Sequence, residues 1–307
     1  MKVMKFGGTS VADQSAIERL IAIVRAERQA EAQTEGGDAR GPIVVVSALS
    51  GVTDRLLGVA ALAQSGDLEG AKSSLRELRA RHITVSEVVT DATLRQSVVE
   101  AINREFDDLE RIVSALVVLQ EVSPRWLDTL AAAGEILSSQ IVAAALIAHK
   151  LQGAWVDSRK AVVTDAEYTA AAPMFEETTA ALMMHADPAL AAGRIPVMGG
   201  FVGATQAGVT TTLGRGGSDF SAAIVGACLG ASEIQIWTDV DGMLTADPRI
   251  VKNPQVVPHL SFAEASELAY FGAKVLHPAT IQPAVARNIP VRILNSQRAT
   301  ARGTLIT

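Results

Sequence analysis

The sequence places a lysine and two glycines at Lys5, Gly7 and Gly8, where a predicted strand passes into a helix. Glycines at this point let the backbone approach a ligand, and their N–H groups, with the N-terminus of the next helix, favour an anion. Lys5 adds a full positive charge. An ordinary turn with a surface lysine explains the same residues, and the spacing is neither a Walker A loop nor a dinucleotide fingerprint.

A second glycine-rich turn covers residues 214–219 (Gly-Arg-Gly-Gly-Ser-Asp) and again joins a strand to a helix. Arg215 could bind a carboxylate or phosphate through two parallel hydrogen bonds, each contributing about 1.5–3 kcal/mol. Ser218 is a natural N-cap for the helix, and Asp219 could pair with a substrate ammonium group. In the structural alternative, Arg215 and Asp219 pair with each other at the helix start.

Acidic residues follow an apolar strand at 237–242 (Trp-Thr-Asp-Val-Asp-Gly), and an Asp-Pro-Arg segment follows at 247–249. Residues after a buried strand lie at the carboxyl edge of the sheet, where open α/β folds bind ligands. Arg249 is well placed in the sequence to reach a phosphate. Two acidic turns are an adequate alternative explanation for Asp241 and Asp247.

Two further charged residues stand out by their surroundings. Glu135 lies in an apolar helix, where a carboxylate is costly unless it has a partner such as a ligand ammonium group. Lys274 lies in a glycine-interrupted loop at 271–278, which taken singly could be any loop.

The composition excludes several classes of protein. Hydrophobic residues make up 49% of the 307 residues, charged residues 20% and aromatic residues 4%, which is the balance of a sheet covered by helices. The net charge of −6 argues against a nucleic-acid-binding surface. No apolar run is expected to reach the length of a membrane span, and no signal peptide is apparent. We therefore expect a cytoplasmic protein.

We expect structural roles for the single cysteine and the five histidines. Cys228 lies in an apolar run, where a buried and inert thiol is expected, and one cysteine cannot form a disulfide framework. The histidines show no metal-ligand spacing.

Alternating strands and helices predict one α/β domain with a largely parallel sheet that is covered on both faces. Strands are expected at 3–6, 43–46, 154–156, 161–164, 195–198, 209–213, 234–237 and, last, 291–294. Helices are expected at 13–33, 218–229, 262–271 and 278–287, with a helical block at 54–151 that Pro124 interrupts. Apolar residues from Leu94 to Leu116 recur every three or four positions, so this block should cover one side of the sheet.

Read together and in this order, these segments closely resemble the catalytic domain of aspartate kinases, which are members of the amino acid kinase family. The resemblance covers nearly the whole chain, and its most specific parts are the lysine-led opening and the segments at 214–219 and 271–278. It implies a three-layer αβα sandwich with a mainly parallel central sheet and two lobes. The amino-acid-binding lobe would cover about 1–200 and the nucleotide-binding lobe about 201–307.

The resemblance also implies a role for each matching residue. Lys5, Gly7 and Gly8 would hold the transferring phosphoryl group, with Asp219 as a further catalytic residue; Arg215 would bind the α-carboxylate, and Glu135 and Asp219 would lie near the ammonium group. The full set expected around the amino acid is Ser47, Thr53, Glu135, Arg215, Gly216, Gly217, Ser218 and Asp219. The expected nucleotide contacts are Lys5, Phe6, Gly7, Gly8, Thr238, Asp239, Leu244, Arg249, Lys274 and Val275.

The family reaction converts L-aspartate and ATP to 4-phospho-L-aspartate and ADP, which is the entry to lysine, threonine and methionine synthesis. A carboxylate is already a nucleophile at neutral pH, so the transfer needs no general base; two anions must be brought together and the developing charge stabilised. Mg²⁺ would bridge the ATP phosphates, and no direct protein ligand is assigned to it.

Two features depart from the family pattern. Leu244 stands where aspartate kinases usually place a tyrosine beside the nucleotide, and the chain stops at Thr307, where relatives usually continue into regulatory ACT domains. We expect one catalytic domain without ACT domains that forms a homodimer, and either a fragment of a longer or fused protein or an enzyme without feedback control. The alternatives are a sibling kinase that acts on another acid, and an inactive sensor of the same fold.

Overall fold

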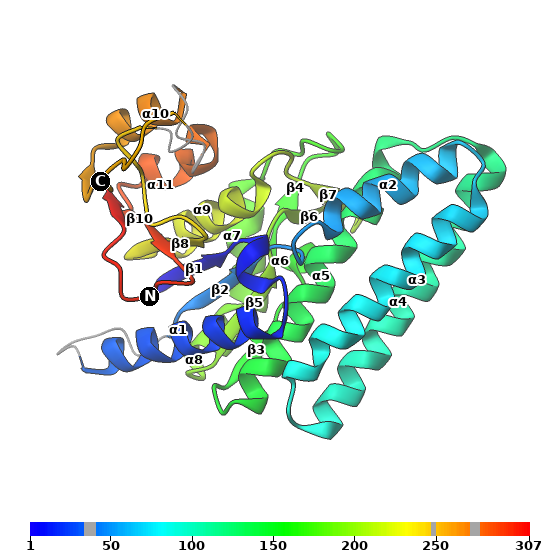
Figure 1. The fold of residues 1–307 in the computed structure, drawn as a ribbon, viewed down its shortest axis with the longest axis horizontal. Coiled ribbons are helices and arrows are strands. Elements are labelled where there is room, and N and C mark those ends of the chain that lie inside the picture. Colours follow the sequence, from blue (N-terminus) through cyan, green and yellow to red (C-terminus); the bar gives the residue numbers. More distant parts are fainter. Residues whose placement is uncertain (34–40, 247–249, 271–276) are drawn as a thin grey trace.

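The computed structural model describes residues 1–33, 41–246, 250–270 and 277–307 (Figure 1). Its centre is an eight-stranded sheet in the order β3-β5-β2-β1-β8-β10-β11-β9. Neighbouring strands are parallel except for the antiparallel pair β10–β11, which confirms the expected α/β class. The strands are β1 Lys2–Phe6, β2 Ile43–Val46, β3 Gly153–Trp155, β5 Ile195–Gly199, β8 Glu233–Thr238, β9 His259–Leu260, β10 Val291–Asn295 and β11 Thr304–Ile306.

Three short strands form a separate small sheet: β4 Val163–Thr164, β6 Val202–Thr205 and β7 Thr210–Thr212. The prediction that the strands at 161–164 and 209–213 belong to the central sheet was therefore wrong, and residue 161 ends a short helix, α6 Ser158–Ala161. Strand 291–294 is also not the last, because β11 follows it. Strands β6, β9 and β11 were not predicted, because they are two to four residues long and their apolar patterns are too short to recognise.

Helices cover both faces of the central sheet. They are α1 Gln14–Gln33, α2 Val52–Gln64, α3 Leu68–Val85, α4 Ala92–Leu119, α5 Pro124–Ala148, α7 Phe175–His185, α8 Asp187–Ala191, α9 Gly217–Leu229, α10 Phe262–Tyr270 and α11 Gln282–Ala286, with short 3₁₀ turns at Gly8–Val11, Ser86–Val88 and Pro278–Ile281. Alternate β1 residues separate two cores: Met4 and Phe6 pack with α1 and α5, whereas Val3 packs with α9 and α11, as the two-residue period of a strand requires.

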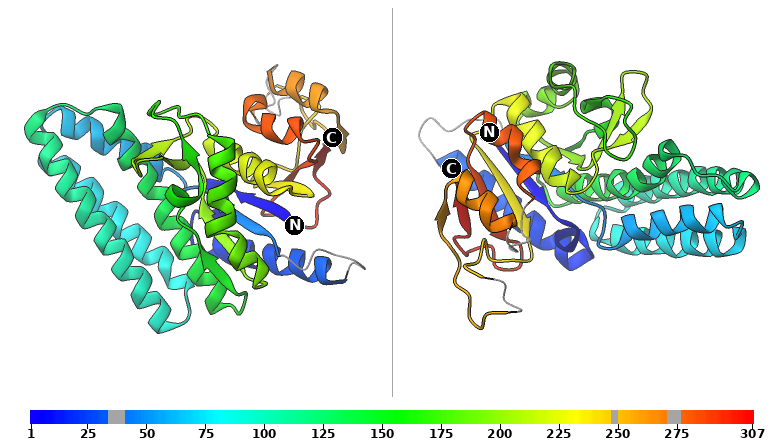
Figure 2. Two further views of the ribbon diagram at one scale, coloured as in Figure 1. Left: turned by 180° about the vertical axis from the view of Figure 1, so that it is seen from behind. Right: turned by 90° about the horizontal axis from the view of Figure 1, so that it is seen from above.

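The helical block covers the sheet only in part. Helix α5 packs on β3 and β5, whereas α2, α3 and α4 pack on one another and on α5. Figure 2 shows these three helices extending away from the sheet beyond α5. The predicted apolar stripe of α4 is buried from Val98 to Leu116, with Leu94 half-buried, but it faces the neighbouring helices instead of the sheet.

Helix α5 corrects the expectation about apolar runs. Over its 25 residues it contains an 18-residue window with a mean hydropathy of 1.7, so that by length and composition alone it could cross a membrane. In the structure, 89% of this window is buried inside the protein, and the helix lies between the sheet and the outer helices (Figure 1). We therefore interpret α5 as the central core helix.

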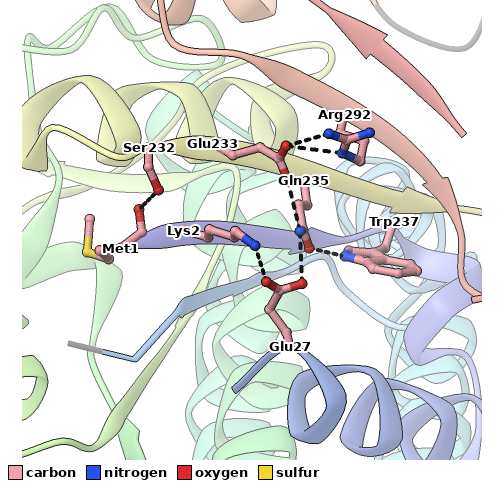
Figure 3. Close-up of polar contacts among 8 residues, drawn as sticks. All are labelled: Met1, Lys2, Glu27, Ser232, Glu233, Gln235, Trp237 and Arg292. Carbon is pink, nitrogen blue, oxygen red and sulfur yellow. Dashed lines mark hydrogen bonds and ion pairs between the residues drawn. The ribbon is translucent and has the colours of Figure 1, made fainter. Parts of the chain in front are cut away.

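A chain of polar side chains runs along one face of β8 (Figure 3). Glu27 of α1 binds Lys2 and accepts a hydrogen bond of 3.1 Å from Gln235 Nε2. Gln235 in turn accepts a 3.0 Å bond from Trp237 Nε1, and the Trp237 backbone carbonyl accepts a 3.0 Å bond from Gly7 N. The network therefore fixes the strand end at which the first glycine turn begins.

Candidate active site

Two adjoining cavities lie at the carboxyl ends of β1, β2 and β8. The large cavity, of about 750 Å³, extends between α5 and the start of α9. The small cavity, of about 500 Å³, extends over the turn after β1. Both are lined by Lys5, Ser47, Thr53, Asp54 and Glu135. The shared residues make the two cavities parts of one cleft.

Lys5 stands at the junction of the two cavities. It is 8% exposed, and its Nζ lies 2.7 Å from Asp219 Oδ1. This ion pair joins β1 to the first turn of α9. The alternative in which Asp219 pairs with Arg215 is therefore not what the structure contains.

Arg215 is exposed at the mouth of the large cavity. Among the described residues it forms no ion pair or hydrogen bond, so its guanidinium group is available to an anion. Gly216 adopts φ 73° and is the N-cap of α9, with no side-chain cap. The prediction of Ser218 as the N-cap was wrong, because the glycine turn starts the helix one residue earlier. Helix N–H groups that no side chain caps can bind an anionic ligand.

Glu135 projects from α5 into both cavities and is only 4% exposed. Burial raises the pKa of Glu135 to about 8, although hydrogen bonding from the Ala48 backbone and the Thr53 side chain opposes the shift. Its Oε2 has no hydrogen-bond partner within the described ranges. A buried carboxyl oxygen without a partner is costly, and an ammonium group would satisfy it.

The small cavity offers backbone donors. Gly7 N is used by Trp237, but the N–H groups of Gly8 and Thr9 make no hydrogen bond to any described residue. Both residues line the small cavity, as do Thr238 and Asp239 from the end of β8. Lys5 with these amides can therefore neutralise a phosphate.

The family model described as the amino acid kinase family matches residues 1–295. The chain belongs to this family. Kinases bind a phosphoryl donor beside its acceptor, and a cleft of two adjoining cavities has room for two such ligands.

Individual relatives of the chain are aspartokinases. The chain is 36% identical to the lysine-sensitive aspartokinase 3 of Escherichia coli over 99% of its length and 63% of the relative. It is 36% identical to an aspartokinase of Chlamydia trachomatis, covering 64% of that protein. A crystal structure of E. coli aspartokinase III in complex with aspartate and ADP matches all of the chain with a TM-score of 0.87. The chain thus spans less than two thirds of the length of these relatives.

The cleft contains most of the site residues predicted from the sequence. Lys5, Ser47, Thr53, Glu135 and the turn at 214–219 line the large cavity; the residues predicted around the phosphates that line the small cavity are Lys5, Gly7, Gly8, Thr238 and Asp239.

Several predicted nucleotide contacts lie elsewhere. The Phe6 side chain is fully buried and stacks on Trp237 with 6.0 Å between ring centroids, so it lines neither cavity. Leu244 is half-buried, pairs through a β-bridge with Val256 and also lines neither cavity. The positions of Arg249, Lys274 and Val275 lie outside the described residues.

Two other residues considered in the sequence analysis have structural roles. Asp241 forms an ion pair with Arg298 and accepts a 2.7 Å hydrogen bond from Asn295, as the acidic-turn alternative proposed. Cys228 is half-buried instead of buried, and burial raises the pKa of its thiol, which favours the unreactive protonated form.

The sequence did not reveal every residue that lines the cleft. The charged and polar ones that it missed are Thr9, Ser50, Asp54, Asp128, Thr169 and Thr212. Asp128 precedes Glu135 by seven positions on α5, which is two helical turns, so both carboxylates lie on one face. That spacing of two acids in an apolar helix was the available signal.

Proposed function

We propose that this chain is the catalytic part of an aspartate kinase, which transfers the γ-phosphoryl group of ATP to the side-chain carboxylate of L-aspartate and forms 4-phospho-L-aspartate. The observation that carries the proposal is the two-part cleft with Lys5 at its junction and Arg215 and Glu135 in one part. The aspartokinase names of its relatives, and the aspartate and ADP bound to the E. coli neighbour, support it.

The large cavity suits an amino acid with two carboxylates. Arg215 would bind the α-carboxylate, and the unpartnered Oε2 of Glu135 would accept a hydrogen bond from the ammonium group, with Asp219 nearby. The remaining carboxylate would then face Lys5. Ser47, Thr53, Gly216, Gly217 and Ser218 complete the wall in this proposal.

The small cavity suits the phosphates of ATP. The free N–H groups near Gly8, together with Lys5, would stabilise the charge that develops on the transferring phosphoryl group. Bound with ATP, Mg²⁺ would neutralise phosphate charge. In the described part of the chain no cluster of three His, Cys, Asp or Glu residues could hold a metal ion, so we assign Mg²⁺ no protein ligand. Leu244, Arg249, Lys274 and Val275 stay proposed contacts of the nucleotide; Leu244, which lines neither cavity, would contact a part of it that extends beyond the small cavity.

The order of strands supports the proposed division into lobes. One half of the central sheet, β3-β5-β2-β1, comes from residues 1–200, and the other half, β8-β10-β11-β9, comes from residues 233–307. We propose that the first half carries the amino acid and the second the nucleotide, within one catalytic domain. We further propose that the protein acts in the cytoplasm as a homodimer, and that the reaction opens lysine, threonine and methionine synthesis.

Trapping with hydroxylamine tests the reaction. The protein, incubated with ATP, Mg²⁺, L-aspartate and hydroxylamine, should form aspartyl hydroxamate, because hydroxylamine captures an acyl phosphate. Reactions that lack ATP or the protein are the controls. Product from another acid but none from aspartate would favour a sibling kinase, and no product from any acid in a panel would favour an inactive sensor.

A further inference from the structure

Asp128 is a buried carboxylate that the proposed chemistry does not use. It projects from α5, is 1% exposed and lines the large cavity. Its Oδ1 accepts a 2.6 Å hydrogen bond from Thr212 Oγ1, and its two oxygens lie 3.1 and 2.9 Å from Thr169 N. Burial raises the pKa of Asp128, and these hydrogen bonds oppose that shift. Its bonding therefore ties α5 to β7 and to the loop at 165–172.

Thr169 adopts an unusual backbone conformation at the point where Asp128 binds it. Its φ is 72°, in the left-handed region that a β-branched residue rarely occupies. Such a conformation persists when surrounding contacts determine it. The Asp128 carboxylate supplies one of these contacts, and a 2.9 Å bond from Ala171 N to the Thr212 carbonyl supplies another.

The same loop packs on the arginine turn, which we define as residues 214–219. Gly214 has φ 74°, and a β-carbon added to it would lie 3.2 Å from the Thr169 carbonyl oxygen. Gly214 also lies two residues after Thr212, the second group that Asp128 binds. Asp128 thus contacts the strand that enters the turn and the loop that packs against it.

The backbone of the arginine turn must be held by neighbouring groups, because the Arg215 side chain makes no polar contact with a described residue that would fix its position. The position of its guanidinium group therefore depends on the backbone of the turn. Asp128, Thr169, Thr212, Gly214 and Arg215 all line the large cavity. They form a continuous path from α5 to the anion-binding group.

We propose that Asp128 is a positioning residue that, through Thr169 and Thr212, holds the arginine turn in the conformation that binds the amino acid. The kinetic part of this inference rests on the proposed function; the structural part does not. An interaction that binds substrate and transition state alike changes KM and not kcat.

The kinetic test compares Asp128→Asn with a matched control. Asp128→Asn should raise KM for L-aspartate about tenfold while leaving kcat and KM for ATP within about twofold. The control is Asp91→Ala, because Asp91 caps α4 through a 2.9 Å bond from Leu94 N and lines neither cavity. Alanine cannot cap a helix, so this control should lose stability without changing KM, which separates positioning from general destabilisation.

A second substitution tests the role of Thr169. Glycine adopts a positive φ without steric cost. With Thr169→Gly, the conformation of the loop should therefore depend less on the hydrogen bonds to the Asp128 carboxylate. The double variant Asp128→Asn, Thr169→Gly should therefore recover most of the aspartate affinity, to within about threefold of the parent. Thr212→Ser, which keeps the hydroxyl, should behave as the parent, and Thr212→Val should raise KM for aspartate.

Amide hydrogen exchange tests the positioning without any turnover. Peptides that cover residues 213–219 should exchange faster in Asp128→Asn than in the parent or in Asp91→Ala. Unchanged exchange in this segment, or a fall in kcat with KM unaltered, would overturn the proposal. If Asp128→Asn does not fold, exchange in Thr212→Val decides in the same way. If the parent protein forms no aspartyl hydroxamate, only the proposed function is refuted. The exchange result does not depend on turnover and would still test the positioning role of Asp128.

Discussion

At the scale of single residues, the ion pair between Lys5 and Asp219 defines the centre of the cleft. It joins residues that are far apart in the sequence at 2.7 Å, and it keeps a cation between the two cavities without exposing it. In the proposed reaction this cation stabilises charge that develops during the transfer, which is an interaction stronger in the transition state than in the ground state.

Removing Lys5 should therefore affect turnover more than binding. We expect Lys5→Ala to lower kcat about a hundredfold or more, with a modest change in KM for aspartate, measured by the hydroxamate assay. Lys2→Ala is the matched control, because Lys2 lies on the same strand but pairs with Glu27 and lines neither cavity. An unchanged kcat in Lys5→Ala would remove Lys5 from the catalytic role.

Glu135 should make the stability of the protein depend on pH. Its folded pKa of about 8 lies above its ordinary value of 4.5. Below pH 4.5 the folded and unfolded states are both protonated; between pH 4.5 and 8 only the unfolded state ionises, so stability falls as the pH rises. Glu135→Gln removes this effect, and its stability relative to the parent should rise by a few kcal/mol between pH 5 and pH 8.

Denaturant unfolding at the two pH values measures this difference. Glu77→Gln serves as the control, since Glu77 is an exposed residue of α3 whose partner is Arg55. Only the change with pH is diagnostic, because replacing the carboxyl group by an amide also changes the free energy of unfolding by an amount that does not depend on pH. A stability difference that is the same at pH 5 and pH 8 would mean that Glu135 is ionised in the empty cleft.

How well single residues could be predicted depends on where their partners lie in the sequence. The place of Lys5 and Arg215 in the cleft was predictable, because a cation beside glycines at a strand end favours anion binding and the resemblance to aspartate kinases decided against an ordinary turn. The contact of Asp128 with Thr212 was not, because the two residues are 84 positions apart. The burial of Phe6 beside Trp237 likewise results from the pairing of β1 with β8, which no local pattern specifies.

At the scale of elements, the pair α3–α4 contains a buried histidine. His82 is fully buried, its Nδ1 lies 2.7 Å from the Leu78 carbonyl oxygen, and its ring lies 5.5 Å from that of Phe106. Its Nε2 has no partner in the described structure. Burial lowers the pKa of His82 to about 4, the Leu78 bond opposes this, and Arg81 adds to it.

This histidine should destabilise the protein in acid. The unfolded state takes up a proton near pH 6.5 and the folded state only near pH 4, so stability falls as the pH decreases through this range. In the parent, His82 should lower the free energy of unfolding by on the order of 3 kcal/mol between pH 7 and pH 4. His82→Leu should remove this loss, as measured by thermal or urea unfolding. His185→Gln, at an exposed position of α7, should keep the parent's acid sensitivity. The same sensitivity in His82→Leu would contradict this account.

Long elements were predicted more completely than short ones. The stripe on α4 repeats over several turns, so its period identified the buried face even though its partners turned out to be helices. Strand β9 has two residues and pairs only because β11 lies beside it. The start of α9 was misjudged because Gly216 at φ 73° ends the turn before Ser218, and backbone conformation of this kind is not visible in composition.

At the scale of the whole molecule, the two halves of the central sheet meet at β1 and β8, and the cleft lies above this junction. The small cavity is lined by Gly7 from one half and by Thr238 and Asp239 from the other. Arg215 lines only the large cavity. A nucleotide and an amino acid should therefore stabilise the fold as two separable contributions.

This separation gives a prediction for ligand-induced stabilisation. A ligand that binds only the folded state adds about 2.7 kcal/mol to the free energy of unfolding when present at a hundred times its Kd. We expect L-aspartate and Mg²⁺–ADP each to stabilise the parent protein by an amount of this order. Arg215→Ala should lose the contribution of aspartate and retain that of Mg²⁺–ADP, because Arg215 does not line the small cavity. Denaturant unfolding with each ligand alone provides the measurement.

The matched control is Arg302→Ala, an exposed arginine that lines neither cavity, and it should retain both contributions. If Arg215→Ala lost the two contributions equally, the cavities would act as one binding site and the division of the cleft between acceptor and donor would be wrong. If it lost neither, Arg215 would not bind the amino acid, and the α-carboxylate would have to be bound by another group, such as the N–H groups at the start of α9.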